Sequence, residues 1–260
     1  MKKELYFYFY VTEDYKDYFT NKIHFKCLEY YKDRFDTVTI GISINNTNDV
    51  DTIYEIEAIF IKIFKGKPIN FIILENDPNY CESKFFYEEI VNKLESHDCV
   101  FFAHNKGLTL KHSTEEEREN IYYWLVGLYY GSLHENRNFG YELCCYYGSF
   151  RTFCDKYLDQ QFTKTSVFYA GTFYWLMCKR IHNYIKLESK ELPPLDSRFY
   201  AENFVTYVYP DLSDSKDSIY IYFDNITHMY YYYEAKKYCE IVNYLNDDFY
   251  ELYNIATKDL

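Results

Sequence analysis

Residues 36–44 read Asp-Thr-Val-Thr-Ile-Gly-Ile-Ser-Ile, a β-branched run that predicts a strand. The segment before it, residues 15–35, predicts a helix with Thr12 as its candidate cap. The apolar run Leu5–Val11 precedes that helix and predicts a first buried strand. A strand, a helix and a second strand in this order are typical of a parallel β-α-β unit.

The same alternation continues along the chain. Apolar residues recur with helical spacing in Val50–Phe64, and Gly66 follows as a stop signal. A strand at 69–74, a helix at 83–94 and a buried strand at 99–103 extend the pattern. Because largely apolar strands alternate with helices, we expect an α/β fold with a mostly parallel central sheet flanked by helices.

The second half of the chain has a less regular pattern. A helix is predicted for residues 115–133, with Ser113 or Thr114 as its cap. The other predictions are a strand at 143–147, a strand turning into a short helix at 167–178, an ordered loop with a helical turn at 191–209, a late strand at 218–223 and a terminal helix at 228–245. No linker or repeat divides the chain, so one domain over residues 1–260 is expected.

Composition and charge exclude several classes of protein. The chain has 28 Lys and Arg against 40 Asp and Glu, a formal net charge of −12. A general nucleic-acid binder needs a basic face, so we expect no nucleic acid as a partner. Aromatic residues make up 22% of the chain, which argues against disorder. The tyrosine excess fits either an AT-rich genome or a surface on which sugars or bases stack.

No membrane span or leader is expected from the sequence. The longest nearly uncharged runs, 121–133 and 167–178, are shorter than the roughly 20 residues that a spanning helix needs. The apolar start breaks at Thr12 without a small-residue cleavage site. The eight cysteines show no C-x-x-C spacing, and Cys99, Cys144 and Cys178 lie in apolar runs. The simplest compartment is therefore a reducing cytoplasm.

Ligands of parallel sheets bind at the carboxyl ends of the strands, so residues that follow strands are the first site candidates. No G-x-G-x-x-G or P-loop motif occurs there, which excludes the common dinucleotide and P-loop classes. The strand at 99–103 leads into His104, Asn105, Lys106 and Gly107. Lys106 would neutralise a diphosphate, and His104 would donate to a phosphate or a sugar hydroxyl. The alternative is an ordinary polar turn.

Two further segments carry candidate binding groups. In the segment 75–83, Asn76 and the pair Glu82-Ser83 would hydrogen-bond a nucleotide, or they would only cap the helix that starts here. In Gly171-Thr172-Phe173-Tyr174-Trp175, small residues would let a ligand approach the backbone and the aromatic rings would stack on a sugar. A tight packing corner is the alternative for this second segment.

A fourth segment, residues 192–204, carries charged groups after two prolines. Asp196, Arg198 and Glu202 follow one another at near-helical spacing. A carboxylate here would serve as a general base towards an acceptor hydroxyl. The alternative is a surface pair between Arg198 and Glu202, worth roughly a few tenths of a kcal/mol.

In this order, the segments resemble the small sugar transferases of bacterial and viral polysaccharide clusters, which have the GT-A (nucleotide-diphospho-sugar transferase) fold. The matching motifs are Asn76…Glu82, His104-Asn105-Lys106-Gly107, Trp124, Gly171-Thr172-Phe173-Tyr174-Trp175, and Leu192-Pro193 with Arg198-Phe199-Tyr200-Ala201-Glu202. The last motif lacks one residue between the aromatic residue and the Ala-Glu pair. The resemblance covers residues 69–204, and its specificity lies in the ordered set.

The resemblance implies a glycosyltransferase that uses a UDP- or GDP-sugar and a glycan acceptor. It implies a nucleotide-sugar-binding half over 1–110, an acceptor-side half over 111–210 and a helical extension over 211–260. It assigns the donor to Asn76, Glu82, His104, Asn105, Lys106 and Gly107, and the substrates to Gly171, Thr172, Trp175 and Arg198. Glu202 or Asp196 would be the catalytic base, with Glu142 as a further alternative.

One departure from the family concerns the metal. Most GT-A enzymes bind Mn²⁺ or Mg²⁺ through an Asp-x-Asp motif after the fourth strand, where this chain has His104-Asn105-Lys106. Asp98 lies before that strand, at the wrong end. Either Lys106 replaces the metal charge, or His104 and a distant carboxylate hold the ion. The alternative of another class is a non-catalytic module that binds glycan or protein on the same scaffold.

Overall fold

The computed structural model describes residues 1–12, 14–105, 114–134, 146–148, 151–154, 166–169, 172–196, 198–208, 235–241, 244–258 and 260. Its main sheet has six strands in the order β3-β2-β1-β4-β8-β5. These are β1 (Lys3–Tyr10), β2 (Thr37–Ile44), β3 (Ile69–Glu75), β4 (Cys99–His104), β5 (Tyr146–Gly148) and β8 (Tyr174–Leu176), while β6 (Arg151–Cys154) and β7 (Ser166–Tyr169) form a separate antiparallel pair. Strands β1 to β4 are parallel, and β8 is antiparallel to both of its neighbours. The predicted α/β class with a mostly parallel sheet is confirmed.

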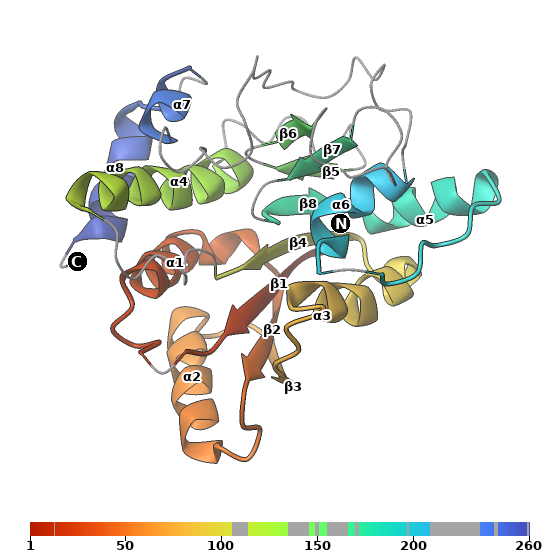
Figure 1. Ribbon diagram of the computed structural model, residues 1–260, viewed down its shortest axis with the longest axis horizontal. Helices are drawn as coiled ribbons and strands as arrows, with labels where there is room; N and C mark the ends of the chain where they lie inside the picture. Colours follow the sequence, from red (N-terminus) through yellow and green to blue (C-terminus); the bar gives the residue numbers. More distant parts are fainter. Residues whose placement is uncertain are drawn as a thin grey trace.

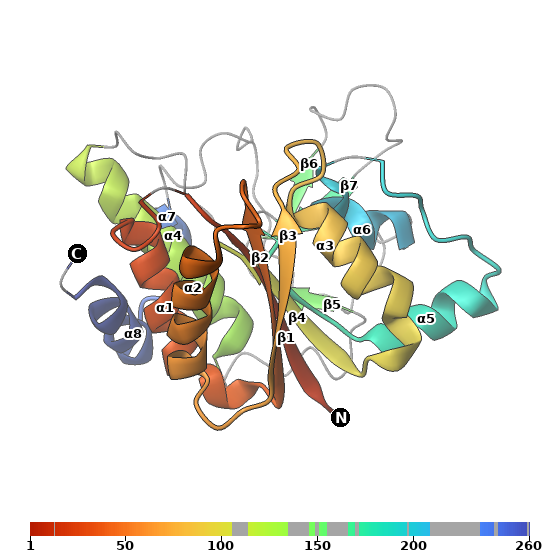
Figure 2. The same cartoon turned by 90° about the horizontal axis from the view of Figure 1, so that it is seen from below.

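Helices cover both faces of this sheet (Figure 1). One layer contains α1 (Phe19–Tyr30), α2 (Val50–Ile63), α4 (Glu115–Leu133), α7 (Ala235–Ile241) and α8 (Asp247–Thr257). The other layer contains α3 (Glu82–Glu89), α5 (Cys178–Leu187) and α6 (Tyr200–Val208). Two short 3-10 turns also occur, η1 (Lys32–Arg34) and η2 (Val91–Ser96). Figure 2 looks along the sheet and shows α1, α2, α4 and α8 on one side, and α3, α5 and α6 on the other.

The alternation of side chains along each strand separates two hydrophobic cores. In β1, Phe7 packs into the core under α1, α2 and α4, whereas Tyr6 and Tyr8 pack into the core under α3 and α6. Gly41 of β2 lies against α3, where a Cβ at position 41 would be 2.8 Å from the Phe85 ring. A side chain larger than hydrogen at this position would therefore push α3 away from the sheet.

Local signals position several helices as predicted. The capping box of Thr114 and Glu117 begins α4, and the helix has the predicted bounds. The Asp49 side chain accepts a hydrogen bond from Thr52 N at the start of α2. The cysteines expected to be small apolar core residues are confirmed at Cys99 and Cys178, while Cys144 lies outside the described residues.

Other predicted bounds are wrong. Thr12 is not a helix cap, because residues 14–17 form a turn and α1 begins after Tyr18, with no side-chain cap bond. The helix predicted at 83–94 divides into α3 and η2. The segment 167–178 is not one strand that turns into a helix. It contains part of β7, all of β8 and the first residue of α5, and β7 and β8 belong to different sheets, because β8 pairs with β4.

The structure also corrects the C-terminal predictions. The loop predicted at 191–209 contains α6, because Tyr200, Phe204 and Val208 recur at helical spacing and are buried. The terminal helix ends with α7 at Ile241, and α8 begins separately after its cap Asn246. The strand predicted at 218–223 lies outside the described residues.

Within the part of the chain that the structure describes, no helix has both the length and the apolar character required to cross a membrane.

Candidate functional site

The order of the sheet strands locates a candidate site between β1 and β4. From β1 the chain winds outwards to β2 and β3, then returns to place β4 on the other side of β1. Ligands of open α/β sheets bind where the strand order reverses in this way, outside the carboxyl ends of the strands. Tyr8 and His104 are register partners on these two strands, and Asn105 N donates to Tyr8 O at 3.2 Å.

A carboxylate and an imidazole lie together at this edge. His104 Nδ1 is 3.3 Å from Glu82 Oε1, and the two side chains are only 8% and 12% exposed. His104 is the last residue of β4, and Glu82 is the first residue of α3, where the helix dipole favours a negative charge. A carboxylate beside one ring nitrogen fixes the orientation of the imidazole, and the other ring nitrogen, Nε2, is buried.

The hydroxyl of Tyr8 belongs to the same polar corner. Burial raises the pKa of the Tyr8 hydroxyl, and the negative charge of Glu82 raises it further. The phenol therefore stays protonated. Tyr8 was not among the predicted site residues, although its position near the end of β1, on the face opposite to Phe7, was the available signal.

Ser83 joins this corner to the segment that follows the two prolines. Its hydroxyl donates to Arg198 O at 2.8 Å and accepts from Ala201 N at 3.0 Å. The first turn of α6, which contains the half-buried Glu202, is thereby tied to the first turn of α3. The sequence predicted that Ser83 either bonds a nucleotide or caps a helix, and this bridge between distant segments was missed.

The other charged groups of that segment are exposed. Asp196 and Arg198 both have exposed side chains, and the Arg198 guanidinium lies 5.4 Å from the centroid of the Phe199 ring. The structure thus brings the backbone of this segment to the corner and leaves these two side chains at the surface.

Asn105 has an internal role at the edge. Its Nδ2 donates to Tyr10 O at 2.8 Å and to Asn21 Oδ1 at 3.1 Å, while its Oδ1 accepts from Tyr10 N at 2.7 Å. The amide thus joins β4 to β1 and to α1. These bonds position the strand ends, and they occupy both N–H groups that a ligand would use.

The aromatic corner before β8 divides into edge and core positions. Thr172 has a φ of 52° and is buried, and the His104 ring centroid is 6.5 Å from that of Phe173. Trp175 is 2% exposed, and its Nε1 donates to Ser132 O at 2.8 Å. The structure therefore gives Trp175 a packing role, whereas Thr172 and Phe173 lie beside the end of β4.

Asn76 lies at the end of β3, which β2 and β1 separate from β4. Its Nδ2 donates to Asn45 Oδ1 at 3.0 Å. The predicted residues Lys106, Gly107, Glu142 and Gly171 lie outside the described residues.

Metal ligands do not gather in the described ranges: no group of three or more His, Cys, Asp or Glu side chains there has a geometry that could hold an ion. Asp98 lies before β4, as predicted, and its Oδ2 accepts from Lys2 N at 2.9 Å. A hydrogen bond from Lys179 and a second from the Lys2 backbone hold the pKa of the Asp98 carboxyl below its usual value.

No family model, no curated protein and no solved structure matches this chain.

Proposed function

We propose that this protein is a glycosyltransferase that moves a sugar from a nucleotide-diphosphate donor to a hydroxyl of a glycan acceptor. The observation that carries the proposal is the convergence at one edge of the sheet. Glu82 pairs with His104, and Ser83 bonds to Arg198 and Ala201, so three motifs that resemble one family meet in one corner. The Rossmann-like order of β3, β2, β1 and β4 supports it, since such sheets bind nucleotides at this edge.

In the proposed reaction, each polar group has one task. Glu82 orients His104, which donates to the diphosphate or to a sugar hydroxyl. Lys106 follows His104 by two positions and offsets the charge of the leaving diphosphate. Glu202 takes the proton from the acceptor hydroxyl, with Asp196 as the alternative base. The acceptor oxygen then bonds to the anomeric carbon, and the bond from that carbon to the phosphate oxygen breaks, with its electron pair leaving on the nucleoside diphosphate.

The proposal is tested by calorimetric titration with UDP and GDP, with Mn²⁺ and with EDTA. We expect one of the two nucleotides to bind and binding to survive EDTA, because Lys106 supplies the charge that a metal would supply. Lys106→Ala should weaken binding by about 1.5–3 kcal/mol, the range for a hydrogen bond to a charged group. Lys84→Ala is the matched control, since Lys84 is an exposed lysine in the first turn of α3.

The outcomes separate the enzyme from the alternative class. Nucleotide binding that Lys106→Ala leaves unchanged would remove Lys106 from the donor site. Complete loss of binding in EDTA, restored by Mn²⁺, would show that a metal carries the charge. No nucleotide binding, together with retained glycan binding, would favour a non-catalytic module.

A further inference from the structure

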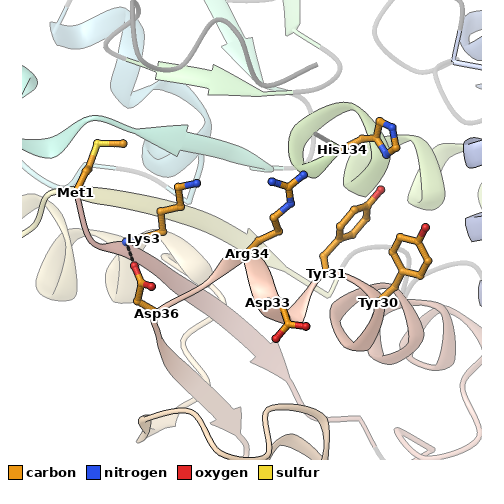
Figure 3. A pocket seen from close by; sticks show the side chains of 8 residues that line it. All are labelled: Met1, Lys3, Tyr30, Tyr31, Asp33, Arg34, Asp36 and His134. Carbon is orange, nitrogen blue, oxygen red and sulfur yellow. Dashed lines mark hydrogen bonds between the residues drawn. The ribbon is translucent and has the colours of Figure 1, made fainter. Parts of the chain in front are cut away.

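An open cavity of about 620 Å³ lies at the opposite end of the sheet from the candidate site (Figure 3). Its lining holds charges of both signs, because Asp33 and Asp36 lie there beside Lys3 and Arg34. Lys3 N already donates to Asp36 Oδ2 at 2.7 Å. A wall of mixed charge favours no class of ligand, whereas the outer edge of the sheet favours one kind of partner.

Strand β3 forms this outer edge. It is the last strand of the main sheet, and β2 is its only strand neighbour in the described part of the chain. Pro68 O accepts from β2 at 3.0 Å and Asn76 N donates to β2 at 3.1 Å, so even-numbered residues direct their backbone groups inwards. Because these directions alternate along a strand, the odd-numbered residues direct their N–H and C=O groups outwards. They are Ile69, Phe71, Ile73 and Glu75.

The side chains along this edge are apolar and incompletely covered. Ile73 is 37% exposed, and Phe71 and Ile72 are half-buried. Edge strands of proteins that stay monomeric are usually short, or carry lysine or proline. β3 has seven residues and contains neither. A strand of this kind is a template for pairing with a strand of another chain.

Helix α2 extends the apolar surface beside β3. Val50, Tyr54 and Ile61 recur at helical spacing and are exposed, in addition to the face that α2 buries in the core. On another side of the helix, Glu55 accepts from Tyr15 Oη at 2.8 Å, so that side faces α1. The exposed stripe therefore lies on the side of α2 towards the outer edge of β3. Figure 2 looks onto this edge and shows β3 between α2 and α3.

The two ends of β3 have opposite charges. The exposed Lys62 and Lys65 precede the strand, whereas the exposed Glu75 ends it and Asp77 follows. A parallel second copy would bring equal charges together. An antiparallel second copy would place the acidic end of each strand beside the basic start of the other. This complementarity favours a second copy as the partner, in a chain whose net charge of −12 otherwise opposes self-association.

We propose that β3 pairs antiparallel with β3 of a second copy of this chain, across a twofold axis at Ile72. In this register Phe71 lies opposite the partner's Ile73, and Ile69 lies opposite the partner's Glu75, so the outward backbone groups of the two strands bond to one another. Ile72 lies opposite its own copy as a pair without hydrogen bonds. The two sheets become one, and both α2 stripes lie on the same face of it.

Sedimentation equilibrium of the full chain over a range of concentrations is the first test, and we expect a dimer. Ile73→Pro should raise the dissociation constant of the dimer about tenfold or more, because it removes one outward N–H from each copy and leaves the bonds to β2 intact. Ile73→Lys is the second variant, for the case in which proline prevents folding. It should also weaken the dimer, because it places a charge in the apolar edge.

A matched control distinguishes the edge from the rest of the surface. Ile255 is 39% exposed, nearly the same fraction as Ile73, and it belongs to α8, on the other side of α1 from β3. Ile255→Lys makes the same change of charge. The dissociation constant of this variant should equal that of the wild type.

A disulfide test measures the register. Ile72→Cys should give a covalent dimer on oxidation, because the two copies of position 72 face each other within the Cα separation of about 4.4–6.8 Å that a disulfide needs. Asn70→Cys is the control on the same face of β3, where the two copies would be roughly 14 Å apart. Non-reducing electrophoresis compares both variants with the wild type, whose own cysteines give the background.

Four results would overturn the proposal. The wild type is a monomer at every concentration, or a dimer whose affinity neither Ile73→Pro nor Ile73→Lys changes. Ile255→Lys weakens the dimer as much as Ile73→Lys, which would place the contact elsewhere. Asn70→Cys forms the covalent dimer as readily as Ile72→Cys, which would exclude this register.

Discussion

Replacing Gly41 by alanine tests how closely α3 packs against the sheet. The added methyl carbon would lie 2.8 to 3.0 Å from three carbons of the Phe85 ring, which is closer than a carbon–carbon contact allows. Phe85 is fully buried among Tyr6, Tyr8 and Phe102, so its ring has little room to turn away. The strain is therefore shared between the ring and α3 as a whole.

The size of the effect follows from two opposing contributions. Inserting one methyl group into a well-packed core costs about 1–3 kcal/mol. Removing a glycine from a strand returns about 0.5–1 kcal/mol, since glycine loses more backbone freedom on folding. With both contributions at the middle of their ranges, the net loss for Gly41→Ala is roughly 1.25 kcal/mol, or about 2.5–5 °C in melting temperature for a chain of this size.

Urea unfolding followed by circular dichroism measures this loss. Phe85→Leu and the double variant complete a mutant cycle, in which the smaller side chain should relieve the contact and make the double variant less destabilised than the sum of the singles. A Gly41→Ala variant as stable as the wild type, or strict additivity in the cycle, would refute the close contact between position 41 and Phe85.

Two further predictions concern charge. Burial alone would raise the pKa of Glu4, but hydrogen bonds from His97 and Lys2 outweigh it and leave the pKa below its usual 4.5. The stability that the Glu4 carboxylate gains from these hydrogen bonds is therefore complete above pH 4.5 and is lost as the pH falls through the lower folded-state pKa. Glu4→Gln should make the free energy of unfolding in urea less dependent on acid pH. The control Glu95→Gln, at an exposed carboxylate, should leave this dependence unchanged. Glu202→Gln should lower kcat of sugar transfer about 10²–10⁴-fold and leave donor affinity unchanged, because a general base acts only in the transition state. Retained turnover with a lower melting temperature would show that Glu202 is structural, and Asp196→Asn would then be the variant to measure.

The first half of the fold was predictable because its signals are local. Strands β1 to β4 are short apolar runs bounded by polar turns, and each pairs with a strand from the same part of the chain. The place of β8 beside β4 was not predictable, since it depends on contacts such as those of Trp175 with Phe35 and Phe101. Sequence spacing carries no record of these distant ring contacts.

The candidate site also combines features that local sequence signals predict with features that depend on contacts between distant residues. Glu82 and His104 were identifiable separately, as a helix start and a strand end. Their 3.3 Å approach depends on how closely α3 lies on the sheet, which the absence of a side chain at Gly41 permits. Asn105 was identified as a ligand group because its type and position allow it, and only the structure shows its amide bonded to Tyr10.

The hydrogen bonds of Ser83 have a consequence for the order in which the protein forms during synthesis. Their partners Arg198 and Ala201 lie 115 and 118 residues further along the chain. As the nascent chain leaves the ribosome, β1 to β4 can pair at once, because every partner among these four strands precedes Asn105. The corner around Glu82 and His104 closes only when α6 has been made, so a chain released before Arg198 would carry the parallel strands without the completed corner.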